Sequence, residues 1–220
     1  MSFIAVAIAL YPGGTWFDYH AVGHSFWLNF LCDLMQTEAL NGEAAPVGSL
    51  FARLGTLAMF TSLAAFFVQI ARLESPVSRH SRLTPGHVAA GAGVVACMFG
   101  FAIPLVPSDL FRNAHLVVVV CAFVPSLVAV IASLVVCLRG PTVSWWIKGL
   151  ALLTLATGAL DGVLYGVGYA QAYQLIPHFQ RWLLNHSLPV LQRLATLALL
   201  GWVIAVNVDA VRTCRARNRL

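Results

Sequence analysis

The chain alternates between long apolar runs and short polar gaps. A helix needs about 20 apolar residues to cross a membrane core of roughly 30 Å. Five runs are long enough: residues 47–71, 87–106, 113–138, 143–169 and 183–207. The first run, from Phe3 to Leu10, reaches only about 12 Å as a helix. We expect it to be a sixth helix, cut short because the true start lies upstream of Met1, that occupies the outer half of the bilayer. A signal peptide is the alternative, although the run lacks a preceding basic segment and a clear cleavage site.

The composition agrees with this pattern. Hydrophobic residues make up 60% of the chain and charged residues only 10%, whereas a soluble domain carries about 25% charged residues. So few charges cannot cover a water-facing surface, which excludes a soluble fold. We predict an all-α, polytopic membrane helical bundle that forms a single integral membrane domain over residues 1–220. It has five full transmembrane helices and one short N-terminal helix.

The charges predict how the bundle is oriented. Basic residues gather in every second gap, and such gaps face the cytoplasm in membrane proteins. We therefore place residues 72–86, 139–147 and 208–220 in the cytoplasm, and residues 11–46, 107–112 and 170–182 outside. Both termini are then cytoplasmic, in what we expect to be a bacterial plasma membrane. The net charge of +5 is explained by these loops, so it does not indicate a nucleic-acid partner. Trp145 and Trp146 are expected at the inner interface, and Trp182 at the outer one.

The first outer loop has the least ordinary sequence. Pro12-Gly13-Gly14 is a break that ends the first helix. After this break we predict an amphipathic helix lying along the outer interface. Its apolar side is formed by Phe26, Trp27, Phe30 and Leu34, and its polar residues are His20, His24, Ser25, Asn29 and Asp33. Two histidines four residues apart can ligate one metal, but no HExxH motif or third ligand accompanies them. We therefore expect neither a metal nor a cofactor.

The run at 143–169 combines small and polar residues at helical spacing. Gly158, Gly162 and Gly166 form a face that lets another helix approach closely, either within the bundle or in a homo-oligomer. A polar stripe of Thr154, Thr157, Asp161 and Tyr165 lies beside it. An acid inside a membrane needs a partner, and we expect Asp161 to pair with Arg53 or Arg193. Such a pair either fixes helix register or belongs to a site for a substrate, proton or ion.

Most of the histidines map to the outer side. On the last run, His186 shares a helical face with Pro189 and Arg193. The outer histidines are His20, His24, His115, His178 and His186, accompanied by Asp18, Asp33 and Asp109. This group is compatible with a divalent metal, a pH sensor, a lipid headgroup or ordinary interfacial hydrogen bonds.

The first outer loop also carries a resemblance. YPGG at residues 11–14, followed by NFLCDL at residues 29–34, resembles the opening of an uncharacterised bacterial family of six-helix membrane proteins. The matching positions are Tyr11, Pro12, Gly13, Asn29, Phe30, Leu31, Asp33 and Leu34, while Cys32 stands where the family usually has serine. The family is similar in outline to DRAM-like and Sfk-like membrane proteins. The resemblance implies a six-helix fold and no particular activity.

A second resemblance is to the membrane hydrolases related to alkaline ceramidases, on the outer Ser, His and Asp residues. Those enzymes carry an HxxxH motif on the last helix, whereas His178 and His186 are eight residues apart here, so the match fails at that point.

Two functions follow from these observations. The first is a non-enzymatic membrane protein with an outer-leaflet polar cavity that binds a membrane lipid or small amphiphile. Its candidate ligand-binding residues are Arg53, Asp161, Tyr165, Arg193, His186 and His115, with His20, His24, Ser25, Asn29 and Asp33 from the outer loop. The alternative is a metal-dependent hydrolase of lipids that uses the outer His and Asp residues. A transporter ranks last, because inverted repeats and paired broken helices are missing.

Overall fold

The computed structural model describes residues 2–73, 83–140, 143–172, 174–175 and 181–217. In these ranges the chain is all helical apart from its loops. The helices are α1 (Ser2–Ala9), α2 (Pro46–Ile70), α3 (Pro85–Ala102), α4 (Arg112–Arg139), α5 (Trp145–Ala172) and α6 (Arg181–Arg217). Short 3-10 turns are η1 (Cys32–Met35), η2 (Ala71–Leu73) and η4 (Ile103–Leu105).

Five of these helical segments are long and apolar enough to span a membrane, so the protein is a multi-pass integral membrane protein. They cover residues 46–73, 85–105, 112–139, 145–171 and 186–212. The prediction of five full spans and a short N-terminal helix is confirmed. Proline is tolerated at the first position of a helix, and two spans begin with it: α2 begins at Pro46 and α3 at Pro85. The Thr84 hydroxyl also caps α3 by accepting a hydrogen bond from the backbone N–H of His87.

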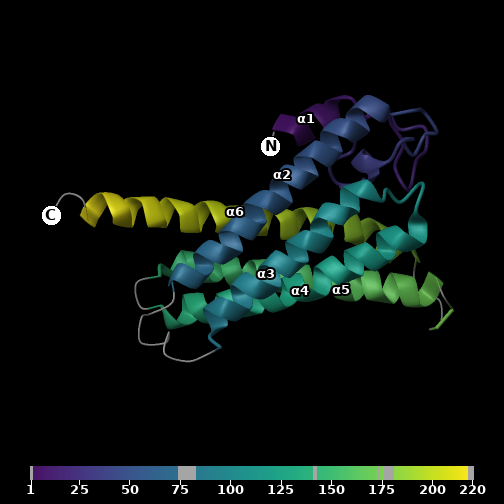
Figure 1. Ribbon diagram of the computed structural model, residues 1–220. Helices are drawn as coiled ribbons and strands as arrows, with labels where there is room; N and C mark the ends of the chain where they lie inside the picture. Colours follow the sequence, from purple (N-terminus) through teal and green to yellow (C-terminus); the bar gives the residue numbers. More distant parts are fainter. Residues whose placement is uncertain (1, 74–82, 141–142, 173, 176–180, 218–220) are drawn as a thin grey trace.

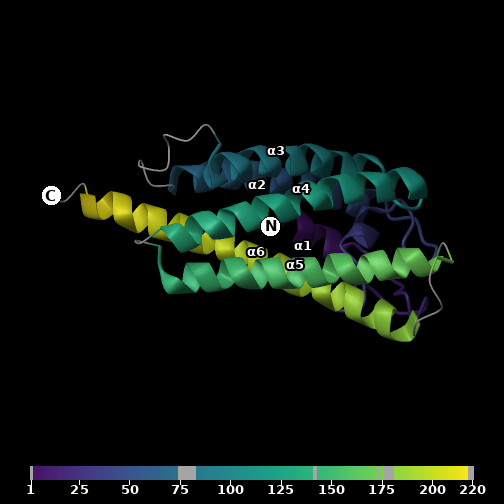
Figure 2. The same cartoon turned by 90° about the horizontal axis from the view of Figure 1, so that it is seen from below.

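The spans run alternately up and down, with α3 beside α4 and α5 beside α6 (Figures 1 and 2). The loop between α1 and α2, the turn between α3 and α4, and the C-terminal end of α5 lie together at one end of the bundle (Figure 1). We call this the loop end. At the opposite end α6 continues beyond the other helices. This grouping agrees with the predicted division into two sets of loops.

The main apolar core lies toward the end opposite the loop. It includes Phe66, Ile70, Ile147 and Trp202, each at most 2% exposed. The rings of Phe66 and Trp202 meet edge to face at 5.0 Å between centroids, a favourable aromatic geometry. A second, smaller core beneath the loop joins α1 and α2. Several buried polar side chains lie at the loop end, among them Asn29, Asp33 and Arg193.

Helix α1 packs against the N-terminal half of α2 (Figure 1). A Cβ atom at Gly55 would lie 2.7 Å from Ile4 Cδ1, so only glycine admits α1 this closely. Gly48 faces Leu10 at the other end of the contact. The short helix thus lies in the half of the bundle nearest the loop, as the length of its apolar run predicts.

The predicted interfacial helix does not form. Residues 11–45 fold as a compact irregular loop in which η1 is the one helical turn described. Two polar side chains explain this difference. Asn29 Oδ1 accepts the backbone N–H of Ser25 at 2.9 Å, and Asp33 Oδ2 accepts that of Phe30 at 2.7 Å. Such short-range side-chain bonds compete with helical backbone bonds. Asn29 and Asp33, which the sequence places on the polar side of a helix, instead stabilise the loop through hydrogen bonds to its backbone.

Candidate functional site

The loop between α1 and α2 does not lie flat on the bundle but enters it. The Met35 carbonyl accepts hydrogen bonds from Ser49 Oγ at 2.8 Å and from Arg53 Nη2 at 3.0 Å, both on α2. Thr56 Oγ1 lies 3.4 Å from Met35 Sδ. Ten residues separate Thr56 from Pro46, the first residue of α2, which corresponds to about 15 Å of helix. The Met35 side chain therefore reaches roughly to mid-span, and the Met35 carbonyl lies at the level of the first two turns of α2.

Irregular backbone at this depth needs protein partners for its polar groups. Helix α6 supplies several of them. Arg193, which is 3% exposed, donates from Nε to the Phe26 carbonyl at 2.8 Å and from Nη2 to the Asn29 carbonyl at 3.0 Å. Its guanidinium carbon lies 5.1 Å from the centre of the Phe26 ring. The neighbouring Gln192 Oε1 accepts the Leu31 backbone N–H at 2.8 Å. The last span thus holds the loop by its main chain.

The two parts of the YPGG and NFLCDL motif bind each other inside the loop. Asn29, which is fully buried, donates from Nδ2 to the Gly14 carbonyl at 2.9 Å and to Asp33 Oδ2 at 3.5 Å. Gly14 has φ +86, and a Cβ there would lie 2.4 Å from the Asn41 backbone nitrogen. Burial raises the pKa of Asp33 to about 6, although hydrogen bonds from Phe30, Asn29 and Trp16 oppose the rise.

Tyr11 and His24 pack together beside this motif. Their rings meet edge to face at 5.5 Å, and the Tyr11 hydroxyl accepts the Leu40 backbone N–H at 3.1 Å. Burial raises the pKa of Tyr11 to about 12 and lowers that of His24 to about 4, the latter also because Arg193 is positively charged. The Nε2 atom of His24 faces Arg193 Nη2 at 3.4 Å, while its buried Nδ1 has no hydrogen-bond partner in the described ranges. At neutral pH this imidazole is uncharged.

Asp161 on α5 does not form the predicted ion pair. Its buried Oδ1 has no hydrogen-bond partner within the described part of the chain. The two candidate arginines instead donate to loop carbonyls, Arg53 to Met35 and Arg193 to Phe26 and Asn29. The expectation of pairing is therefore wrong for the described residues. The reason is that the loop's buried backbone carbonyls occupy both guanidinium groups.

Asp161 nevertheless lies near several of the predicted residues. Its charge acts on Cys32 of the loop and on Tyr165 of α5, and Asp33 and Arg193 also act on Cys32. The Tyr165 ring lies 5.9 Å from that of Phe30 and 6.3 Å from that of Tyr169. We call this group the loop-end cluster; its members are Asn29, Cys32, Asp33, Asp161, Tyr165 and Arg193.

The other candidate residues lie apart from this cluster or at its edge. His115 Nδ1 contacts the Val106 carbonyl at 2.7 Å, which ties the start of α4 to the preceding turn. The His186 ring stacks on Phe17 at 3.7 Å, and His20 is exposed on the loop. His178 and the Trp182 side chain lie outside the described residues. Across the described ranges, no three His, Cys, Asp or Glu side chains gather closely enough to hold a metal ion.

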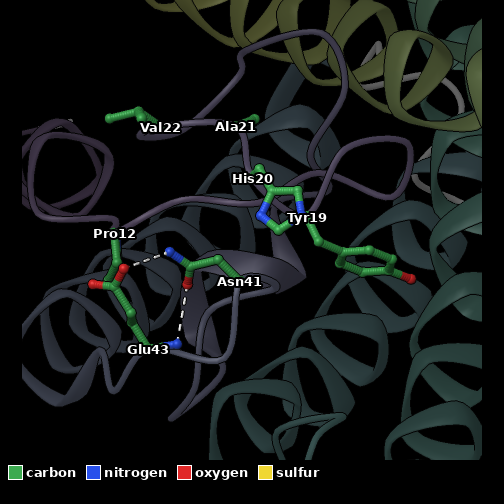
Figure 3. A pocket seen from close by; sticks show the side chains of 7 residues that line it. All are labelled: Pro12, Tyr19, His20, Ala21, Val22, Asn41 and Glu43. Atoms are coloured by element: carbon green, nitrogen blue, oxygen red, sulfur yellow. Dashed lines mark hydrogen bonds between the residues drawn. The ribbon is translucent and has the colours of Figure 1, made fainter.

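A shallow pocket of about 280 Å³ lies on the loop itself and includes His20 (Figure 3). Its other lining residues are Pro12, Tyr19, Ala21, Val22, Asn41 and Glu43. Asn41 Nδ2 donates to Glu43 Oε1 at 2.9 Å, and the Glu43 backbone N–H donates to Asn41 Oδ1 at 3.0 Å (Figure 3). Asn41 and Glu43 therefore satisfy each other's polar groups within this pocket.

The glycine face of α5 is used in only one place within the described chain. A Cβ at Gly162 would lie 2.1 Å from Phe123 Cζ of α4, whereas Gly158 and Gly166 have nothing within 4 Å of that position. The face therefore admits one aromatic ring of α4. Its other two glycines are open.

Three groups that hold the loop are not predicted by the pattern of the sequence: the Ser49 hydroxyl, the Gln192 side chain and the Met35 carbonyl. One signal was present, because Gln192 and Arg193 are adjacent polar residues within an apolar span. Polar residues inside an apolar span indicate that other buried polar groups lie nearby and bind to them.

No family model, curated protein or solved structure matches this chain.

Proposed function

We propose that this membrane protein is non-enzymatic and binds a lipid or small amphiphile at the loop-end cluster. The observation that carries the proposal is the buried Oδ1 of Asp161, which lacks a partner in the described chain while the backbone groups around it are paired. Buried polar atoms in proteins are nearly always hydrogen-bonded, so an unpartnered one beside an irregular loop favours an exogenous partner.

The position of the cluster favours an amphiphile over a water-soluble ligand. Asp161 is sixteen residues from Trp145, the first residue of α5, which places it about 24 Å along the helix. Its neighbours on the same helix include exposed apolar side chains, Leu160 at 49% and Val163 at 61%. A ligand there has its polar group at the cluster and its tail against the apolar faces of the spans.

Three further expectations belong to this proposal. The loop end faces the outside of a bacterial plasma membrane, and both termini are cytoplasmic. The chain is a member of the six-helix family that the Tyr11–Gly14 and Asn29–Leu34 segments resemble. Gly158 and Gly166, being open, are available to a second copy of the chain.

Native mass spectrometry of the protein extracted in a neutral detergent tests the proposal. We expect one co-purified lipid or amphiphile to persist at activation energies that strip bulk lipid, and Asp161→Ala to lose it. Thr157→Ala is the matched control, because within the described residues the Thr157 hydroxyl bonds to its own helix, at the Leu153 and Thr154 carbonyls. Equal retention by Asp161→Ala and wild type, or no retention by either, would contradict the proposal.

The hydrolase alternative has no observation in its favour. Elemental analysis addresses it directly. About one zinc per chain, lost in His20→Ala or His186→Ala, would replace the binding function with the hydrolase.

A further inference from the structure

The loop-end cluster also indicates which headgroup chemistry it accepts. We propose that the group bound there is a protonated amine, carried by an amphiphile, that pairs with Asp161. This inference rests on the proposed function and narrows its ligand class.

The positive charge of the cluster is directed toward the loop backbone. Arg193 donates from Nε and Nη2 to the Phe26 and Asn29 carbonyls. Arg53, which lies outside the cluster, likewise donates from Nε and Nη2 to the Met35 carbonyl. A phosphate or carboxylate would compete with the loop backbone for these donors, and losing them would strand buried carbonyls. The cluster is therefore poorly arranged for an anionic group.

Oδ1 of Asp161 has no hydrogen-bond partner in the described residues. When the carboxylate is ionised, it only accepts hydrogen bonds, so the partner that it takes is then a donor. An isolated carboxylate is costly in a membrane interior, and a cation beside it offsets that cost. A protonated primary amine supplies both the N–H and the charge.

Aromatic rings lie beside Asp161. Tyr165 follows it by one helical turn and packs between Phe30, at 5.9 Å, and Tyr169, at 6.3 Å. Aromatic faces attract ammonium groups, and more strongly when water is excluded. Gly158 precedes Asp161 by about one turn, and a Cβ at Gly158 would have nothing within 4 Å in the described chain.

Amphiphiles that share one tail provide the first test. Dodecylamine, dodecanol and dodecyl phosphate are titrated into the protein in neutral maltoside micelles, and the melting temperature is followed. We expect dodecylamine alone to raise it in a saturable way, by several degrees. Asp161→Asn should lose most of this rise, whereas Glu38→Gln should keep it, because Glu38 is an exposed acid on the loop. An equal rise with dodecyl phosphate or dodecanol would overturn the amine assignment.

A second measurement uses the wild-type protein and so does not depend on how a variant folds. A carbodiimide joins a bound primary amine to a neighbouring carboxyl as an amide, with loss of one water. We expect the peptide that contains Asp161 to gain the mass of dodecylamine less water at lower amine concentrations than the peptide that contains Asp109. Equal coupling at both sites would mean that the amine partitions without a site.

The two proposals fail in different ways. If native mass spectrometry finds a retained lipid that depends on Asp161 but the amine has no advantage, the binding function stands and the headgroup assignment falls. If phosphatidylethanolamine is retained in preference to phosphatidylglycerol, the natural amine is a lipid headgroup. Retention of a non-lipid amine instead identifies a free amphiphile.

Discussion

At the residue scale, Arg53 and Arg193 donate hydrogen bonds to backbone carbonyls of the loop and not to the Asp161 carboxylate. The sequence places Arg53, Asp161 and Arg193 at similar depth, and charge alone then predicts a pair. In the structure Arg53 donates to the Met35 carbonyl. Arg193 donates to the Phe26 and Asn29 carbonyls. A hydrogen bond to a charged donor is worth about 1.5–3 kcal/mol, and each arginine makes at least two. These contacts therefore compete well with a single ion pair.

Asp33 is buried in the loop and His24 is half-buried there, and their burial predicts opposite effects of pH on the stability of the protein. The pKa of Asp33 is raised from 3.8 to about 6, so its contribution to stability is present below pH 3.8 and lost as pH rises through 6. The pKa of His24 is lowered from 6.5 to about 4, so its contribution is present above pH 6.5 and lost as pH falls through 4. The two contributions offset each other between these limits.

Single substitutions should separate them. As pH falls from about 6.5 to 4, His24→Gln should gain stability relative to wild type, because Asp33 remains. Asp33→Asn should lose stability relative to wild type over the same interval, because His24 remains. Melting temperatures in a nonionic detergent measure both differences. Two parallel curves, each at a constant offset from wild type, would show that neither group is perturbed by burial.

At the scale of elements, the spans were predictable and the loop was not. The apolar runs are long, and prolines at 46 and 85 mark two helix starts, so local rules suffice there. The segment from Phe26 to Leu34 has helical periodicity, but Asn29 and Asp33 bond to the backbone of Ser25 and Phe30 instead. The backbone of this segment is also held from across the bundle by Gln192, at Leu31, and by Arg193, at Asn29, which come more than 160 residues later in the chain. Periodicity carries no information about contacts so distant.

The glycines of α5 allow a matched test of helix packing. Gly162→Ala should destabilise the protein by about 1–3 kcal/mol, because the new Cβ meets Phe123 at 2.1 Å. Gly158→Ala makes the same chemical change one turn earlier, where nothing lies within 4 Å. There we expect no loss, or a gain of up to about 1 kcal/mol from helix propensity. Unfolding by titration with a denaturing detergent gives both values.

Gel filtration of the same two variants addresses self-association. If Gly158→Ala shifts the protein to a smaller species, the open glycines contact a second copy. If both variants lose the same stability, the contact of α5 with α4 is not the cause.

At the scale of the whole molecule, the distribution of charge predicts which way the bundle is inserted. Arg72, Arg139, Lys148 and Arg212 lie at the end opposite the loop, whereas Asp18, Glu38, Glu43 and Asp109 lie at the loop end. Basic residues are retained in the cytoplasm. A fluorescent protein fused after Leu220 should therefore be bright, and alkaline phosphatase fused there should be inactive. Phosphatase fused after Ala172, at the end of α5, should be active. The reverse pattern would show that the loop end faces the cytoplasm.

The contacts between the loop and α6 have a consequence for biosynthesis. Phe26 is translated long before Arg193, and the two are 167 residues apart. We therefore expect the loop to lack its contacts with α6 until the last span has been synthesised. Its docking then links the first part of the chain to the last. A chain that ends before α6 lacks Gln192 and Arg193, so we expect its loop to be more open to proteases than the loop of the 220-residue chain.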